Sequence, residues 1–480
     1  MGDFTQLAIF FGILALIGGV TYLHCRSADS GDTSSEKDYF LANSGLSWYF
    51  VAGSITLTNL STDQLVGMNG SQMLLLAWWE LAAVVGLLIL AFVFLPIYYR
   101  NNCTTTTELL QRKYNDKNIR ALISLLFLLG NLFIFLPAVL YSGSLFLKSM
   151  MGIDTPIIVL AVGFATIGAL YAILGGLRAV AISDTYSGVL ILTLALLVVW
   201  LALDAIGFDL SGIPSERLSM IGANHSSIPW HTLLTGMIFI QTFYWSTNQV
   251  ITQRAMAAPS VREAQKGVLT AAGIRLLIVP IIVVVPGVVA YKLYGDVGDA
   301  AYGRIVGDIL PVWLSGAFAA GIAAAVLTTF NSILNASAAL YVCDIHEAYI
   351  GDVNNVPRMS GVVSIAMTIL SIALVPVFAT QESLIDTIQE AYGLLSMPIL
   401  SAFIVGLLFR GVHAFAAILG VLTGVAFYAV FTYYWEPFHY IHGMFLTLML
   451  SISVALISNI VLFGRPIELA ANPSASPALD

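Results

Sequence analysis

The stretch SITLTNLSTDQLVGMNG, residues 54–70, decides the fold that this sequence predicts. It lies inside an apolar segment that begins near Trp48, but its centre is a polar run, NLSTDQ, at residues 59–64 that includes the ionisable Asp63. Such groups are costly at membrane depth unless they face a protein interior or a wet cavity. We therefore predict a discontinuous helix, whose freed carbonyls can bind a cation and whose side chains can bind a polar solute. A helix bundle held by interhelical hydrogen bonds is the simpler alternative.

The composition places the chain among integral membrane proteins. Of its 480 residues, 59% are hydrophobic and 10% charged, and the mean hydropathy is +0.90. A soluble domain carries about 25% charged residues. The net charge of -8 and the lack of a basic tail give no reason to expect a nucleic-acid partner. Cys25, Cys103 and Cys343 have neither metal-ligand nor CxxC spacing, so we expect no disulfide and no cysteine metal site.

Hydropathy predicts thirteen membrane-spanning helices, because a spanning helix needs roughly 20 apolar residues. The predicted ranges are 6–24, 47–68, 74–99, 121–147, 155–174, 181–204, 231–251, 269–291, 310–343, 359–379, 388–409, 412–434 and 442–463. When the N-terminus is placed outside, most of the 19 Lys and Arg residues fall in inner loops. We therefore predict that the N-terminus is outside and the C-terminus is cytoplasmic.

An internal echo suggests that the chain is built from two related halves. The run STDQ at 61–64 in the second predicted span resembles STNQ at 246–249 in the seventh, and both runs interrupt apolar spans. Many secondary transporters consist of inverted repeats with broken helices in corresponding positions. A chance match of four residues is the competing explanation.

A second polar cluster interrupts the small-residue stretch Ala323–Asn335, AAAVLTTFNSILN. Thr328 and Ser332 are four residues apart, so they share one helix face. Two hydroxyls on this helix, facing the opened carbonyls of another helix, would form the oxygen cage that Na⁺ prefers. Alternatively, the threonines bond back to their own helix or hold helices together.

Several stretches together resemble the sodium:solute symporter family, and within it the bacterial and animal sodium/sugar cotransporters. The resemblance extends from about residue 38 to 410, in the stretches DYFLA (38–42), 59–70, YAILGGLRAVAISD (171–184), NQVITQRAMAAPSVREAQKG (248–267), 323–335 and IQEAYGLLSMP (388–398). It implies an all-α integral membrane protein of the leucine-transporter-type fold, with two inverted five-helix repeats. The implied organisation is a first peripheral helix and cytoplasmic loop (1–46), the first repeat (47–204), an extracellular loop (205–230), the second repeat (231–409), and two peripheral helices with a tail (410–480).

The resemblance also implies a sodium site between two helices. Backbone carbonyls come from the broken helix and from the 323–335 stretch, and hydroxyls come from two threonines where relatives often have serine. These residues are Leu57, Leu60, Ala325, Thr328 and Thr329. A second sodium, which some relatives bind, would use Asp184, Thr328, Asn331 and Ser332, but Asn331 departs from the hydroxyl pattern.

The implied solute site contains amides, charges and aromatic rings. The matching residues are Asn59, Gln64, Glu80, Gln241, Tyr244, Arg275 and Gln389, with Trp79 beside Glu80. Amides both donate and accept, Glu accepts and Arg donates, as a hydroxyl-rich guest requires. Relatives specific for sugars often have asparagine at Gln241, lysine at Arg275 and serine at Ala83, and a guanidinium suits a carboxylate-bearing sugar. Arg275 could instead pair with Glu80 or Asp63, and Asp63 could be a scaffold residue.

The expected protein is a secondary active transporter that couples Na⁺ entry to uptake of a hexose-like sugar by alternating access. An acidic sugar, a polyol or another small organic solute is the alternative substrate. No nucleophile–base pair, metal cluster or phosphate loop indicates an enzyme, and no filter-like loop indicates a channel. We expect a functional monomer among the lipids of a plasma membrane, a bacterial inner membrane, with a small sugar-like molecule as its partner.

Overall fold

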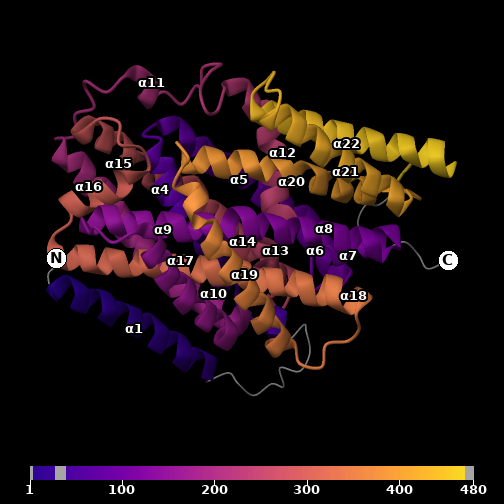
Figure 1. Cartoon of the computed structure of the whole chain (residues 1–480), viewed down its shortest axis with the longest axis horizontal. Helices are drawn as coiled ribbons and strands as arrows, with labels where there is room; N and C mark the ends of the chain where they lie inside the picture. The colour runs from indigo at the N-terminus through magenta and orange to yellow at the C-terminus, as the bar shows by residue number, and fades with distance from the viewer. Residues whose placement is uncertain (1–3, 27–38, 471–480) are drawn as a thin grey trace.

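The computed structural model describes residues 4–26 and 39–470, which are almost entirely helical (Figure 1). The one sheet within these residues is a short antiparallel pair, β1 (Phe409–Arg410) with β2 (Glu468–Leu469). Most of the expected loop after the first helix, and residues 471–480 of the tail, lie outside the described residues.

The helices follow one another in two groups. Before the long loop at 206–229 they are α1 (Phe4–Arg26), η1 (Ala42–Ser44), α3 (Trp48–Asn59), α4 (Thr62–Gly70), η2 (Leu74–Ala77), α5 (Trp78–Ile89), η3 (Leu90–Phe94), α6 (Leu95–Arg100), α7 (Glu108–Tyr114), α8 (Lys117–Gly130), η4 (Asn131–Phe135), α9 (Leu136–Met151) and α10 (Ile157–Ala205). The loop contains α11 (Ser215–Leu218), and after it come η5 (Trp230–Leu234), α12 (Gly236–Ser246), α13 (Gln249–Met256), α14 (Val261–Leu277), α15 (Val279–Tyr294), η6 (Gly298–Ala300), α16 (Ala301–Ile309), α17 (Val312–Ala339), η7 (Leu340–His346), α18 (Glu347–Tyr349), α19 (Val356–Phe378), α20 (Leu384–Leu408), α21 (Ala414–Tyr433) and α22 (Tyr440–Phe463).

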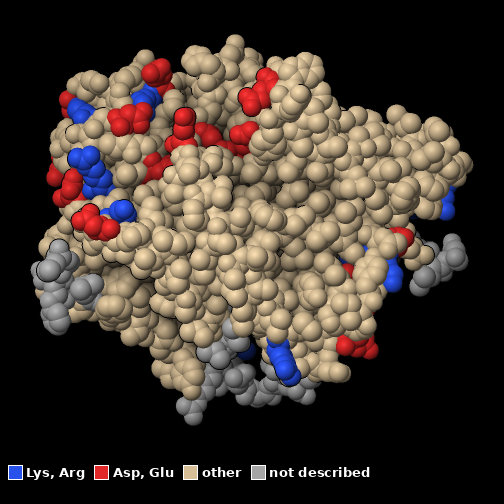
Figure 2. Space-filling view, viewed as in Figure 1, with Lys and Arg blue, Asp and Glu red and all other residues tan. Residues whose placement is uncertain are grey.

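Nine helical stretches in the described part of the chain are long and apolar enough to cross a membrane. Two shorter apolar stretches are Ala8–Leu23 and Ile157–Leu170. Together with the interrupted helices at 48–70 and 236–256, these stretches overlap the predicted ranges, and the number of crossings stays a prediction. Figure 2 shows charged side chains gathered toward opposite ends of the molecule, with a broad band between them that has few.

The first interrupted helix has the predicted break. Helix α3 ends at Asn59, Leu60 leaves the helical region at φ -75° and ψ 65°, and Ser61 is extended before α4 begins. The Ser61 N–H donates to the Asn59 carbonyl at 2.7 Å, so the carbonyl of Leu57 does not receive its usual i+4 donor. The polar run therefore ends one helix and starts another within the buried interior.

The second interruption lies at the matching run STNQ, residues 246–249. Helix α12 ends at Ser246, Thr247 is irregular, and the Asn248 side chain caps α13 by accepting from the Val250 N–H at 3.0 Å. Asparagine is a favoured N-cap because its side-chain oxygen satisfies an orphan donor of the first turn. Both runs that we matched in the sequence thus occupy helix breaks, which supports the proposed repeat.

Helix α10 differs from the prediction. We expected two spans, 155–174 and 181–204, with an inner connection at Arg178, but the chain is one continuous helix from Ile157 to Ala205. The connecting sequence contains no proline, and glycine costs only about 1 kcal/mol in a helix. At 1.5 Å per residue, its 49 residues exceed the roughly 40–45 Å of a bilayer with its headgroups.

Helix α17, with its continuation to Tyr349, is the most deeply buried of the nine long apolar stretches in the described part of the chain. It packs against α1, α3, α9, α10 and α19. Close approach requires small residues: a Cβ on Gly143 of α9 would lie 2.4 Å from Val326 of α17, and one on Gly53 of α3 would lie 2.4 Å from Thr185 of α10. This packing brings the Ala323–Asn335 cluster beside the first break.

Candidate functional site

A cavity of about 50 Å³ lies between the first break and helices α5, α12 and α20. Six of the seven predicted solute residues line it: Asn59, Gln64, Glu80, Gln241, Tyr244 and Gln389. Trp79 and Asp63 also line it. Gln389 does not cap its helix, because the N-cap of α20 is Ser383.

Several polar atoms at this cavity are buried without a hydrogen-bond partner. They are the acceptors Asn59 Oδ1, Asp63 Oδ1 and Gln64 Oε1, and the donor Trp79 Nε1. Buried polar groups in proteins are otherwise almost always satisfied. A guest rich in hydroxyl donors would satisfy these acceptors, so the arrangement is suited to binding a polar ligand.

The seventh predicted residue, Arg275, does not line the cavity. Its guanidinium is fully buried, forms an ion pair with Glu80, and donates from Nη2 to the Thr56 carbonyl at 3.3 Å. Its Cζ lies 4.4 Å from the centre of the Trp245 ring. The structure therefore has the ion pair that we considered as an alternative. Of its two members, only Glu80 lines the cavity.

Gln241 also uses its amide on protein partners. Its Nε2 donates to the Trp79 carbonyl at 2.9 Å, and its Oε1 accepts from Trp245 Nε1 at 2.9 Å. The first bond joins α12 to the backbone of α5, and the second holds the Trp245 ring within α12. The amide of Gln241, which departs from the family pattern, is thus bonded to the protein.

Tyr244 is held at the first break, because Asn59 Nδ2 donates to its hydroxyl at 2.8 Å. Sequence reasoning missed a second pair of the same kind. Asn248, at the second break, donates from Nδ2 to the hydroxyl of Tyr392 at 2.8 Å. The ring centroids of Tyr244 and Tyr392 are 5.9 Å apart. The position of Asn248 in the echoed run and of Tyr392 beside Gln389 could have suggested this pairing.

The residues of the expected sodium site supply oxygen atoms of the expected kinds. Thr328 Oγ1 donates to the Ala325 carbonyl at 3.3 Å, as in the back-bonding alternative, whereas Thr329 Oγ1 is buried without a partner. The carbonyl of Leu57 lacks its i+4 donor, as described above, and Leu60 lies at the break itself. Carbonyl and hydroxyl oxygens at a helix break fit a hard cation.

Asp184, expected at a second sodium site, bonds to α3. Its Oδ2 accepts from Ser54 Oγ at 2.6 Å and from Thr58 Oγ1 at 3.3 Å. Oδ1 has no hydrogen-bond partner. Asn331 and Ser332 are buried with polar atoms that form no hydrogen bond, so no hydrogen bond from these atoms reaches Asp184.

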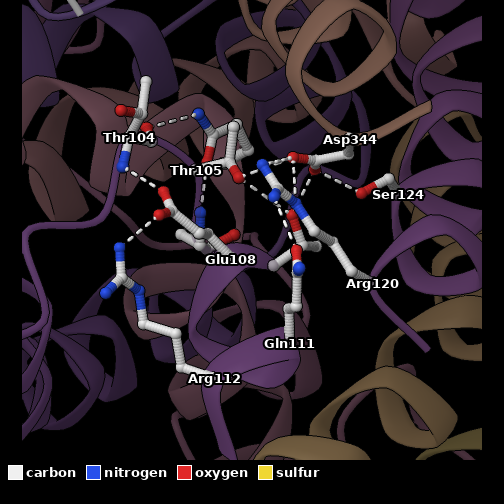
Figure 3. A network of polar contacts seen from close by, with 11 residues as sticks. Thr104, Thr105, Glu108, Gln111, Arg112, Arg120, Ser124 and Asp344 are labelled. Carbon is white, nitrogen blue, oxygen red and sulfur yellow. Dashed lines mark hydrogen bonds and ion pairs between the residues drawn. The ribbon is translucent and has the colours of Figure 1, made fainter. Parts of the chain in front are cut away.

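A separate polar network surrounds Asp344 in η7 (Figure 3). Its carboxylate is fully buried and accepts from Thr105 at 2.8 Å, from Thr107 and Ser124, and from Arg120 Nε at 2.7 Å. The network connects η7 with α8 and with the segment before α7. The Thr106 N–H extends the network to α13 by donating to Gln249 Oε1 at 2.8 Å.

This helical architecture, with a polar cavity at paired helix breaks, is that of a membrane transporter. The model of the sodium:solute symporter family matches residues 39–424. The chain belongs to the sodium:solute symporter family and is a sodium-coupled solute symporter.

The curated proteins that are similar to this chain include a symporter and sodium-coupled cotransporters. The chain is 32% identical to an uncharacterized symporter, YidK, of Escherichia coli (strain K12), over 95% of this chain and 84% of the relative. It is 30% identical to a sodium/glucose cotransporter of Vibrio parahaemolyticus, over 88% of this chain and 84% of that protein. Against the mouse sodium/myo-inositol cotransporter 2 the identity is 26%, over 81% and 64% of the two chains.

Two solved structures share the fold. A substrate-bound, outward-open Na⁺-coupled sialic acid symporter matches with a TM-score of 0.83 and 19% identity, over 98% of this chain and all of that one. A nucleobase-cation-symport-1 family transporter, Mhp1, matches with a TM-score of 0.56 and 15% identity, over 93% and 98% of the two chains. The fold is therefore that of leucine-transporter-like transporters.

Proposed function

We propose that this symporter carries a neutral polyhydroxylated solute, such as a hexose or a polyol, into the cell by alternating access. The observation that carries the proposal is the cavity wall, where amide oxygens are free to accept hydroxyls and the charge of Glu80 is already balanced by Arg275. Trp79 and Tyr244 offer ring faces to the apolar face of a sugar. The names of the glucose and myo-inositol relatives support the same class of solute.

An acidic sugar is a weaker candidate than the sequence suggested. That expectation depended on a guanidinium facing the guest, but Arg275 does not line the cavity, and its Nη1 and Nη2 donate to Glu80 and to the Thr56 carbonyl. An anionic guest would meet the carboxylates of Glu80 and Asp63 at the wall. The likeness to the sialic acid symporter, at 19% identity, is evidence for the fold and not for the substrate.

In the proposed mechanism, Na⁺ enters between the first break and α17, held by Leu57, Leu60, Ala325, Thr328 and Thr329. The ion favours the conformation in which solute enters from outside, and its differential affinity sets how far the equilibrium moves. Each unit charge gains about 2.3 kcal/mol per 100 mV of membrane potential. Movement of Tyr244 away from Asn59 then opens a route to the cytoplasm.

The proposed topology keeps an outside N-terminus and inverted repeats at 47–204 and 231–409. The peripheral segments are 1–46 and 410–480, the outer loop is 205–230, and the protein acts as a monomer in the bacterial inner membrane. Charged residues at opposite ends of Figure 2 and the interruption of one helix in each half support this organisation.

The test is uptake by proteoliposomes, with labelled glucose, galactose, myo-inositol and glucuronate offered with and without a sodium gradient. We expect sodium-dependent uptake of at least one neutral compound and none of glucuronate. Uptake of glucuronate in preference to every neutral compound would contradict the proposal, as would uptake that needs no sodium.

A further inference from the structure

A second, smaller cavity of about 20 Å³ adjoins the solute cavity, and Asn59, Asp63 and Tyr244 line both. A volume of about 10–15 Å³ is enough for one water-sized occupant. The smaller cavity therefore accommodates a single water molecule or ion. Thr329 and Ser61 also line it, whereas Leu57, Leu60, Ala325 and Thr328 do not.

The oxygen atoms around this cavity lack protein partners. Asn59 Oδ1, Asp63 Oδ1 and Thr329 Oγ1 are buried and form no hydrogen bond, and the three side chains are 7%, 9% and 4% exposed. They come from three elements, the end of α3, the first turn of α4, and α17. Carboxylate, amide and hydroxyl oxygens form the donor set of a hard cation.

The charge of Asp63 also has no ion-pair partner, although backbone N–H groups of Asp63 and Gln64 approach the carboxylate. None of the ion pairs recorded across residues 4–26 and 39–470 includes Asp63. Glu80, another carboxylate at the solute cavity, has Arg275 as its partner. A buried carboxylate within a membrane is costly without a positive partner, and a sugar supplies none.

We propose that Asp63, Asn59 and Thr329 bind a sodium ion in the smaller cavity, beside the site expected at Leu57, Leu60, Ala325, Thr328 and Thr329, so that Thr329 serves both positions. The ion neutralises Asp63 and fixes the side chain of Asn59, which in turn holds the hydroxyl of Tyr244. Sodium at this position thus stabilises the wall of the solute cavity and couples directly to solute binding. The inference rests on the sodium-coupled function and does not depend on the identity of the solute.

The experiment measures equilibrium binding of radioactive sodium to the purified full-length protein, with no solute present. We expect Asp63→Asn to bind one sodium ion fewer per protein than the wild type, and Thr328→Ala to retain the ion at Asp63. Asp63→Glu keeps the charge on a longer side chain, so we expect it to bind the same number of ions with about tenfold weaker affinity, which corresponds to about 1.4 kcal/mol.

The matched control is Asp386→Asn, which removes another carboxylate with an unpartnered Oδ1 that does not line the smaller cavity. It should bind as many ions as the wild type. Equal sodium stoichiometry in Asp63→Asn and the wild type would overturn the proposal, and so would the same loss in both asparagine variants. Thermal unfolding in potassium shows whether each variant is folded. Sugar uptake is scored separately, so an incorrect substrate class leaves this result intact.

Discussion

Two buried aspartates in this protein have opposite environments. Asp344 is surrounded by hydroxyl and guanidinium donors from neighbouring elements (Figure 3), whereas Asp63 Oδ1 has no protein donor. Both side chains are buried, so burial alone does not separate them. A carboxylate that the protein satisfies completely holds elements together, and one that it leaves unsatisfied at a cavity is available to a ligand.

The largest expected effect is at the satisfied carboxylate. Asp344→Ala leaves Arg120 without its buried partner and breaks the connection between η7 and α8, so we expect a loss of about 3–5 kcal/mol of stability. Thermal unfolding of the purified protein checks this. Arg112→Ala, which removes the more exposed Arg112–Glu108 pair, is the control and should change stability by less than about 1 kcal/mol. Similar thermal unfolding midpoints for the two variants would contradict the larger contribution expected from the buried carboxylate of Asp344.

Thr329→Ala should have the next largest effect, because Thr329 faces both proposed sodium positions. We expect the sodium concentration for half-maximal uptake to rise by about tenfold or more, equivalent to about 1.4 kcal/mol. Thr329→Ser keeps the hydroxyl and should stay near the wild type. Unchanged sodium dependence in the alanine variant would show that this hydroxyl is not a ligand.

Gln64→Ala and Gln389→Ala should weaken solute binding and leave sodium binding in place, because both amides line the solute cavity but not the smaller one. One hydrogen bond to a neutral guest contributes about 0.5–1.5 kcal/mol, so we expect a several-fold rise in the solute dissociation constant. Calorimetric titration of each variant with solute and, separately, with sodium measures the two affinities. A parallel loss of both would indicate misfolding.

Arg275→Lys should have a moderate effect of a few-fold on uptake of neutral solutes, with no gain or loss that is specific to acidic ones. Lysine keeps the charge beside Glu80 but lacks the planar fork that reaches both Glu80 and the Thr56 carbonyl. Competition of uptake by glucose and by glucuronate measures the selectivity. A selective change for glucuronate would place the guanidinium in contact with the guest.

The smallest expected effect is a pH dependence at the N-terminal end of α20. Burial raises the pKa of the Asp299 carboxyl from 3.8 to about 6, and this carboxyl accepts from the Leu384 N–H at 3.0 Å. A raised carboxyl pKa favours the folded state at acidic pH, and that contribution is lost as the pH rises from about 4 to 6.

Asp299→Asn keeps an acceptor for the Leu384 N–H and removes the ionisation. We expect thermal midpoints similar to the wild type at pH 4 and higher than the wild type above pH 6. The difference appears because the wild-type Asp299 carboxyl ionises with a pKa of about 6 and the asparagine does not ionise. Midpoints that differ by a constant amount across this range would exclude the ionisation of Asp299 as the cause.

Local patterns predicted much of the fold because their causes are local. The polar run at 59–64 cannot continue an apolar membrane helix without burying its polar groups, and the helix does break at Leu60. The same reasoning found the second break at Asn248. Helix α10 was predicted incorrectly because a charge and two glycines near Arg178 resemble a connection, although nothing in that sequence prevents a helix.

The sequence by itself determined the membrane class and the breaks, since hydropathy and polar interruptions act over short distances, and its resemblance to the family implied six residues of the solute cavity. Only the tertiary structure decided which charges are satisfied. Glu80 and Arg275 are 195 residues apart, and their pairing depends on how α5 packs against α14. Asp63 has no ion-pair partner among the described residues, a difference that depends on packing and not on residue type.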